Sequence, residues 1–249
     1  CWVAAGNESR AFADYVVAAA AAERVFAYDE AATAYAAALE LRPTDLPPAE
    51  LAQILLGSAA ASAALMRAEE AIVSLRAAAS AAVEAGDIEL EAEALRLLGR
   101  QLAFARSSTE AMIHLRRAAG LLPEGTLGRA RAQSSLARML LVTDGLEEAS
   151  RLAPEVLEVA ERHGDRLLRA SALGTIGRVL AHTAGPESAR PYLLDALTEA
   201  EAVGAAEEAA RAHNNYLTLL EHSGAPLEEF LAGLDRALAA WDGMGHAAW

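Results

Sequence analysis

The sequence predicts an all-α fold in which about six helical hairpins stack in a row as an α-solenoid. Two observations carry this prediction. Apolar residues recur at steps of three and four, which is the spacing of an amphipathic helix. Small residues also recur with a period near 40 residues, and such a period across paired helices indicates stacked repeats.

A small residue at the start of the second helix of each hairpin marks the period. It recurs in steps of 40, 40, 38 and 40 residues, as Ala31, Ala71, Ala111, Ala149 and Ala189. Twelve residues before each of these, the first helix carries Ala19, Ala59, Gly99, Ala137 and Gly177. Seven residues after each come Ala38, Ala78, Ala118, Val156 and Ala196. Because small side chains let helices approach closely, we expect these positions at the helix–helix contacts.

Turn residues set the limits of the repeats. Pro47-Pro48 opens the second repeat, while Gly86-Asp87 and Gly164-Asp165 combine a left-handed C-cap with the N-cap of the next helix. We expect a single domain over residues 1–249. Its repeats fall at about 7–46, 47–87, 88–125, 126–165, 166–204 and 205–240, with a C-terminal cap at 241–249. Gly125 and Gly128 make the loosest connection, where we place a hinge. Trp241 and Trp249 either cover the end of the stack or meet a partner in a longer protein.

Composition excludes several classes of function. The chain is 54% hydrophobic but only 5% aromatic, which suits close-packed helices. A net charge of −14 argues against the chain as a whole binding nucleic acid or an anionic membrane. Cys1 is the single cysteine, so neither an intrachain disulfide nor a thiolate metal cluster can form. With no signal peptide and no apolar run of about 20 residues, a cytoplasmic location is expected. The missing initiator Met suggests a fragment or a processed product.

Catalytic, cofactor and metal motifs are not recognisable, and we expect no enzyme activity, no cofactor and no bound metal. His182 and His222 occupy equivalent places in successive repeats, where their position favours the last turn of a helix over a metal site. The run His213-Asn214-Asn215 is too polar for a core stripe, and we interpret it as a ligand contact or a solvated face.

The first helices of stacked hairpins line a concave groove, so residues on their outer side are candidate binding residues. If Leu98 and Gly99 face the core, Arg96 and Arg100 face the groove. The equivalent positions in later repeats hold Ser134 and Arg138, Gly174 and Arg178, then Asn214 and Thr218. We predict that Arg96, Arg100, Arg138, Arg178 and Asn214 hold an acidic peptide segment or a small anionic inducer, because guanidinium groups match carboxylate and phosphate. The alternative is that each arginine only pairs with an acid of a neighbouring helix, such as Glu91 or Glu93, contributing about 0–1 kcal/mol.

Two stretches resemble the tetratricopeptide repeat. Residues 28–43, with Tyr35, Ala38 and Pro43, resemble its second helix, and Leu95, Leu98-Gly99 and Leu102 resemble its first. The resemblance covers nearly the whole chain and implies a right-handed solenoid. The repeats are longer than usual and are similar to the helical sensor region of large ATP-binding regulators of the LuxR type, the MalT-like group. Residues 2–12, running into 21–26, look like the junction with the ATPase module of such proteins.

That resemblance implies a non-catalytic region of a transcription regulator, which binds an inducer or a protein partner and restrains neighbouring modules. The chain lacks the lysine that a phosphate loop needs and shows no helix-turn-helix, so we expect neither ATPase activity nor direct DNA binding from this segment. A free-standing tetratricopeptide scaffold or peptide receptor, or an accessory domain of a signalling enzyme, are the alternatives. The inducer and the oligomeric state stay open.

Overall fold

The structure is a computed structural model that describes residues 7–105 and 107–244, with side chains described as far as residue 240. Over these residues it contains twelve α-helices, which divide into two compact units between Leu122 and Pro123. The single domain over residues 1–249 and the hinge near Gly125 stay predictions. The predicted capping by Trp241 and Trp249 lies outside the described side chains, as does the start of the predicted junction, at residues 2–6.

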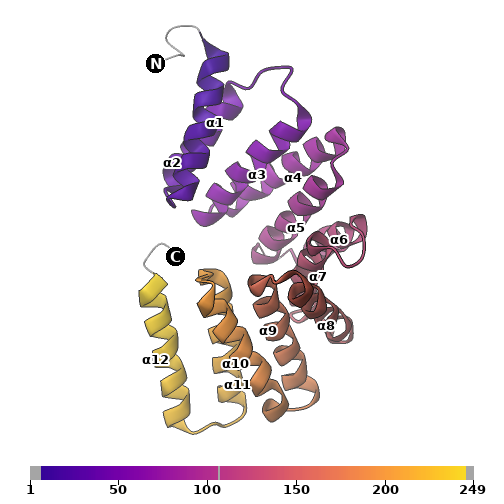
Figure 1. Ribbon diagram of the computed structural model, residues 1–249, viewed down its shortest axis with the longest axis vertical. Helices are drawn as coiled ribbons and strands as arrows, with labels where there is room; N and C mark the ends of the chain where they lie inside the picture. The colour runs from indigo at the N-terminus through magenta and orange to yellow at the C-terminus, as the bar shows by residue number, and fades with distance from the viewer. Residues whose placement is uncertain (1–6, 106, 245–249) are drawn as a thin grey trace. The chain divides into compact units, whose positions relative to one another are not determined.

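The N-terminal unit contains three helical hairpins (Figure 1). Its helices are α1 (Glu8–Arg24), α2 (Tyr28–Glu40), α3 (Pro48–Ala64), α4 (Ala68–Ala85), α5 (Ile88–Phe104) and α6 (Ser108–Leu121). Each helix packs against the next in the chain, and the first helices α1, α3 and α5 also contact one another in succession. The unit therefore has a layer of first helices and a layer of second helices.

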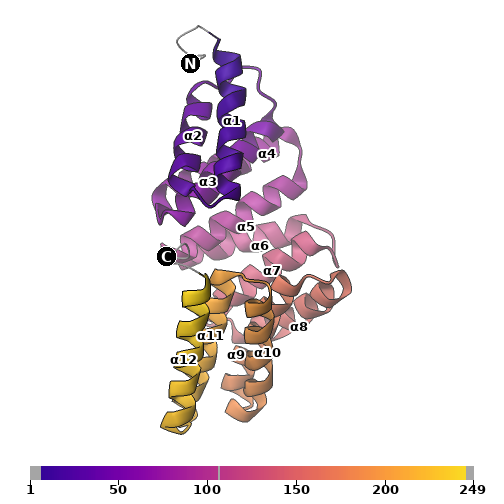
Figure 2. The same cartoon turned by 60° about the vertical axis from the view of Figure 1, so that its left-hand side comes forward.

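The C-terminal unit repeats this arrangement, and its last helices lie side by side in both views (Figures 1 and 2). It contains α7 (Leu127–Leu140), α8 (Leu146–His163), α9 (Arg166–Thr183), α10 (Pro186–Ala202), α11 (Ala206–His222) and α12 (Leu227–Met244). Here α7 contacts α9, and α9 contacts α11. No helix in the described part of the chain is long and apolar enough to cross a membrane.

The predicted turn residues cap the helices as expected. Asp87 Oδ1 accepts a hydrogen bond from Leu90 N at 2.9 Å, and Asp165 Oδ1 accepts one from Leu168 N at 3.0 Å. The preceding glycines, Gly86 and Gly164, end α4 and α8 in the left-handed conformation, with φ of 67° and 66°. These caps satisfy backbone groups that the helix ends leave open, which fixes where one repeat stops and the next begins.

The small residues that mark the period are among the most deeply buried residues of the fold. The five markers at the start of the second helices all have 0% exposure: Ala31, Ala71, Ala111, Ala149 and Ala189. Gly99 and Gly177 lie where the helices pack too closely for a side chain. A Cβ at Gly99 would lie 2.6 Å from Leu115 Cγ, and one at Gly177 would lie 2.6 Å from Leu193 Cγ. In these two hairpins, a leucine of the second helix therefore lies on a glycine of the first.

His213 is buried inside the last hairpins, so the interpretation of residues 213–215 as a solvated face is wrong for this residue. Its side chain is 1% exposed, and Nε2 lies 3.0 Å from Oε1 of Glu201 on α10. Glu201 in turn accepts a hydrogen bond from Arg236 of α12 at 2.7 Å. Burial lowers the pKa of His213, and the positive charge of Arg236 lowers it further against the opposing effect of Glu201.

Acidification is therefore expected to destabilise the C-terminal unit through His213. The unfolded chain binds this proton with an ordinary pKa near 6.5, whereas the folded chain binds it less readily. The stability that neutral His213 supports is fully present above about pH 6.5, and it is lost as the pH falls through the lower folded pKa. Melting temperatures between pH 7.5 and 5 should fall more for the wild type than for His213→Gln. His163→Gln, at an exposed helix end, should follow the wild type, and identical pH profiles for all three proteins would contradict the prediction.

Candidate functional site

The predicted arginine strip falls on first helices of both units. Arg96 and Arg100 lie on α5 in the N-terminal unit, whereas Arg138 lies on α7, Arg178 on α9 and Asn214 on α11 in the C-terminal unit. Three neighbouring first helices thus bring candidate residues together in the C-terminal unit. The candidate site therefore lies on α7, α9 and α11.

In the N-terminal unit, Arg96 forms an ion pair with Glu93 on its own helix, and its role in binding stays a prediction. Its Nε donates to Glu93 Oε2 at 2.8 Å, one turn earlier on the same helix, and only 14% of its side chain is exposed. Arg100 is half-buried one turn later on α5. Glu93 therefore already neutralises Arg96, which reduces the capacity of Arg96 to bind the carboxylate of a ligand.

A polar network joins α7, α9 and α11 in the C-terminal unit. Ser134 Oγ of α7 lies 2.8 Å from Ser171 Oγ of α9, and both serines are buried. Arg211 of α11 donates from Nη2 to the Ser171 carbonyl oxygen at 3.2 Å. Its guanidinium lies over Gly174, where an added Cβ would come within 3.1 Å of Nη2. The missing side chain of Gly174 thus provides the space that Arg211 occupies.

Two of the arginines in this network are neutralised by one buried carboxylate. Glu208 of α11 is 6% exposed and accepts a hydrogen bond from Arg211 Nε at 3.1 Å. Arg138 Nη1 lies 3.8 Å from Glu208 Oε2, and Arg138 Nη2 lies 3.6 Å from Glu207 Oε1. Glu207 and Glu208 therefore form ion pairs with the two neighbouring cations, Arg138 and Arg211.

Arg178 differs, because no carboxylate among the described residues forms an ion pair with it. Its Nη1 donates instead to the neutral Asn215 Oδ1 at 3.2 Å. Burial lowers the pKa of Arg178, and the positive charge of Arg211 lowers it further. The amide Nδ2 of Asn215 has no hydrogen-bond partner, although Asn215 is only 3% exposed. The half-buried Arg178 thus has no compensating carboxylate among the described residues, and a guanidinium in this state suits an anion.

Several assignments from the sequence change in the structure. Ser134 and Gly174 are buried in the network, although the spacing predicted that they face the groove. Asn214 is exposed, and its neighbour Asn215 contacts Arg178 instead. Sequence reasoning missed Arg211 and Glu208, because they lie about one and two turns before Asn214, the position compared. Their separation of three residues, which permits an ion pair on one helix, was the available signal.

No group of three or more His, Cys, Asp or Glu side chains that could hold a metal ion occurs within the described residues. His182 and His222 each place Nδ1 2.8 Å from a backbone carbonyl one turn earlier, that of Arg178 and that of Thr218, in the last turns of α9 and α11. They therefore act as helix-end residues, as expected.

No family model and no curated protein matches the sequence, but many solved structures share the fold. The Rap protein complexed with competence and sporulation factor has a TM-score of 0.70 at 14% identity, covering 96% of this chain and 78% of that one. The Rap conjugation gene regulator of the plasmid pLS20, solved with the Phr* peptide, has a TM-score of 0.70 at 17% identity, covering 91% and 60%.

YrrB is described as a TPR protein with an unusual peptide-binding site. It has a TM-score of 0.51 at 22% identity and covers 74% of this chain and 84% of its own. At these identities the likeness shows the fold and not a shared function. The chain folds as an all-α solenoid of the tetratricopeptide type.

Proposed function

We propose that this chain is a non-catalytic binding domain that holds an acidic segment of a protein or peptide, or a small anionic inducer, on α7, α9 and α11. Arg178 is the anchor, and Asn215 holds it by accepting a hydrogen bond at Oδ1. Arg138 and Arg211 add positive potential, although Glu207 and Glu208 compensate them. Arg96, Arg100 and Asn214 stay predicted contacts of secondary importance.

The observation that carries the proposal is the pairing of a half-buried Arg178 with a neutral amide. A partly desolvated cation without a counter-ion is costly, so a bound carboxylate gains both charge neutralisation and charge-assisted hydrogen bonds. Asn215 is neutral, so its hydrogen bond to Arg178 leaves the positive charge uncompensated. Both observations thus favour an anionic ligand.

The structural neighbours support a binding role, since one Rap structure is a complex with competence and sporulation factor and another is a complex with the Phr* peptide. We further propose that the chain serves as the sensor region of a signal-responsive transcription regulator of the LuxR, MalT-like type, in the cytoplasm. A free-standing tetratricopeptide receptor is the second candidate, which the Phr* peptide complex and the peptide-binding site of YrrB favour. A phosphate loop upstream and a helix-turn-helix downstream in the reading frame would support the regulator over the receptor.

Replacing Arg178 with Ala is expected to weaken the binding of an acidic peptide about 30-fold. Truncating one side of a partly buried charge pair costs about 2 kcal/mol or more, and each 1.4 kcal/mol is tenfold in affinity. A fluorescein-labelled peptide rich in Asp and Glu, titrated by fluorescence anisotropy at about 0.15 M salt, is the measurement. The same peptide with Asn and Gln at these positions should bind far more weakly.

Arg151→Ala is the matched control, since it removes the same charge from an exposed position on α8. It should change the affinity less than twofold to threefold, the size expected of a screened surface charge. Unchanged melting temperatures would show that both variants fold. Equal affinities of the wild type and Arg178→Ala would contradict the proposed site.

A further inference from the structure

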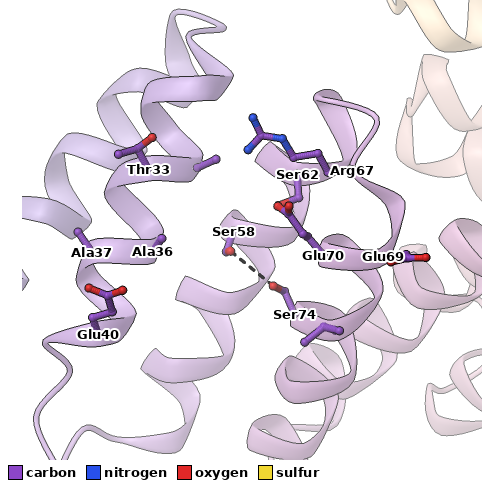
Figure 3. Close-up of a pocket in the computed structure, with 12 residues that line it drawn as sticks. Thr33, Ala36, Ala37, Glu40, Ser58, Ser62, Arg67, Glu69, Glu70 and Ser74 are labelled. Atoms are coloured by element: carbon purple, nitrogen blue, oxygen red, sulfur yellow. Dashed lines mark hydrogen bonds between the residues drawn. The ribbon is translucent and has the colours of Figure 1, made fainter.

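The N-terminal unit contains a separate groove on its layer of second helices, with a volume of about 850 Å³. Figure 3 shows its two walls facing each other across the opening. One wall is formed by Ala36, Ala37 and Glu40 of α2, and the other by Ser62 of α3 with Glu70 and Ser74 of α4. Most of these side chains are short, so the backbone of a bound segment could lie close to the helices.

The internal repeat shows what this groove lacks. In the next repeat, Arg76 of α4 reaches across to Glu110 of α6 and donates a hydrogen bond to it. This hydrogen bond lowers the pKa of Glu110 below its ordinary value, against the opposing effect of burial. The groove lined by Arg76 has a volume of only 260 Å³. An arginine therefore spans the second helices of repeats two and three.

Counting back 40 residues from Arg76 and Glu110 gives Ala36 and Glu70. The acid is retained in the groove, but alanine stands where the bridging arginine would be. Glu70 makes no ion pair within the described residues and accepts only a long hydrogen bond from Ser62 Oγ, at 3.4 Å. The groove thus lacks the cation that pairs with the equivalent acid in the next repeat.

The charges around the groove favour a cationic occupant. Glu40 and Glu70 lie on opposite walls, and Glu69 lines the rim and points away from the serines (Figure 3). Arg67 is the one cation among the lining residues, and its Nη2 is bound to Asp29 Oδ1 at 2.9 Å. The remaining field is negative, in a chain whose net charge is −14.

We propose that this groove docks an arginine-bearing segment of a partner protein. The guanidinium of that segment pairs with Glu70 as Arg76 pairs with Glu110, and Glu40 faces it from the other wall. The walls of Ala and Ser admit the backbone that carries the arginine. This site lies in the other unit from Arg178 and takes a ligand of opposite charge, so the two proposals stand or fall independently.

Ala36→Arg tests the proposal, because it supplies the missing bridge from within the chain. The probe is a labelled alanine-rich peptide with three arginines on one helical face, measured by anisotropy at about 0.15 M salt. Binding by Ala36→Arg should fall about tenfold or more. Ala13→Arg adds the same charge at an exposed position of α1, outside the groove, and should stay close to the wild type.

A second pair of variants isolates the carboxylate. Glu70→Gln should weaken the arginine peptide about tenfold, whereas Glu30→Gln, an exposed acid on α2 outside the groove, should change it little. A peptide with glutamine in place of arginine should bind far more weakly than the arginine peptide. The proposal is overturned if Ala36→Arg and Ala13→Arg bind alike, or if the glutamine peptide binds as well as the arginine peptide. Circular dichroism melts of all four variants show that each is folded.

Discussion

Replacing Leu193 with Ala is expected to lower the free energy of unfolding by about 3 kcal/mol. Leu193 is 1% exposed and lies against Gly177 of the preceding helix, where its side-chain atoms Cδ2 and Cγ come within 2.5 and 2.6 Å of an ideal Cβ position. Its loss removes buried apolar contacts and leaves a cavity, and buried Leu→Ala changes cost about 2–5 kcal/mol. Urea denaturation followed by circular dichroism measures the effect.

The partner glycine sharpens this prediction. Gly177→Ala should destabilise by about 1–2 kcal/mol, although alanine is the better helix former by about 1 kcal/mol, because the new methyl group overlaps Leu193 Cγ and Cδ2. In the double variant the methyl group enters the space that Leu193→Ala vacates. The double variant should therefore be more stable than the sum of the single effects predicts, by about 1 kcal/mol.

Gly120→Ala is the control, since nothing lies within 4 Å of an added Cβ there, in the last turn of α6. It should raise stability slightly through helix propensity alone. Strict additivity of Gly177→Ala and Leu193→Ala would show that the glycine is not required by the leucine. A stabilising Gly177→Ala would contradict the packing argument altogether.

The architecture was predictable because it depends on a repeated steric requirement. Ala31 and its counterparts must be small wherever two helices touch closely, and this need recurs at the repeat period, so it is visible without coordinates. Caps such as Gly86-Asp87 are equally local. The need for glycine at position 57 was not predictable in the same way. The side chain that excludes a Cβ there is Tyr35 of the preceding repeat, whose hydroxyl oxygen would lie 2.3 Å from it.

The candidate site was predicted less well because the network depends on helix rotation. A one-residue difference in facing decides whether Asn214 or Asn215 meets Arg178, and apolar periodicity does not resolve it. Two connections were also not predicted. Phe26 and Met66 both adopt φ of 59°, a conformation that sequence patterns assign to glycine or asparagine. Both side chains are exposed, and the turns carry backbone hydrogen bonds of the kind that end a helix, from Ala27 N to Ala22 O and from Arg67 N to Ser62 O.

Replacing Glu208 with Ala should destabilise the C-terminal unit by about 3 kcal/mol, the cost of leaving buried charge unpaired. Glu208 has 8% of its side chain exposed and is the carboxylate shared by Arg138 and Arg211. Without it, Arg211 loses its ion pair and stands beside Arg178, which has none. Three cations then share a partly desolvated surface with one exposed acid, Glu207. Urea denaturation of the variant measures the loss.

Glu207→Ala is the matched comparison, because the two acids are adjacent and both lie near Arg138, yet 55% of the Glu207 side chain is exposed. Water screens the Glu207 charge, so its loss should cost about 0.5 kcal/mol or less. Added phosphate should restore more stability to Glu208→Ala than to Glu207→Ala, since an anion can replace the missing carboxylate only where the cations are left exposed to each other. Equal losses in the two variants would mean that the network is screened throughout. That result would also contradict the proposed role of Arg178 in binding an anion, because its electrostatic environment would be that of an ordinary surface residue.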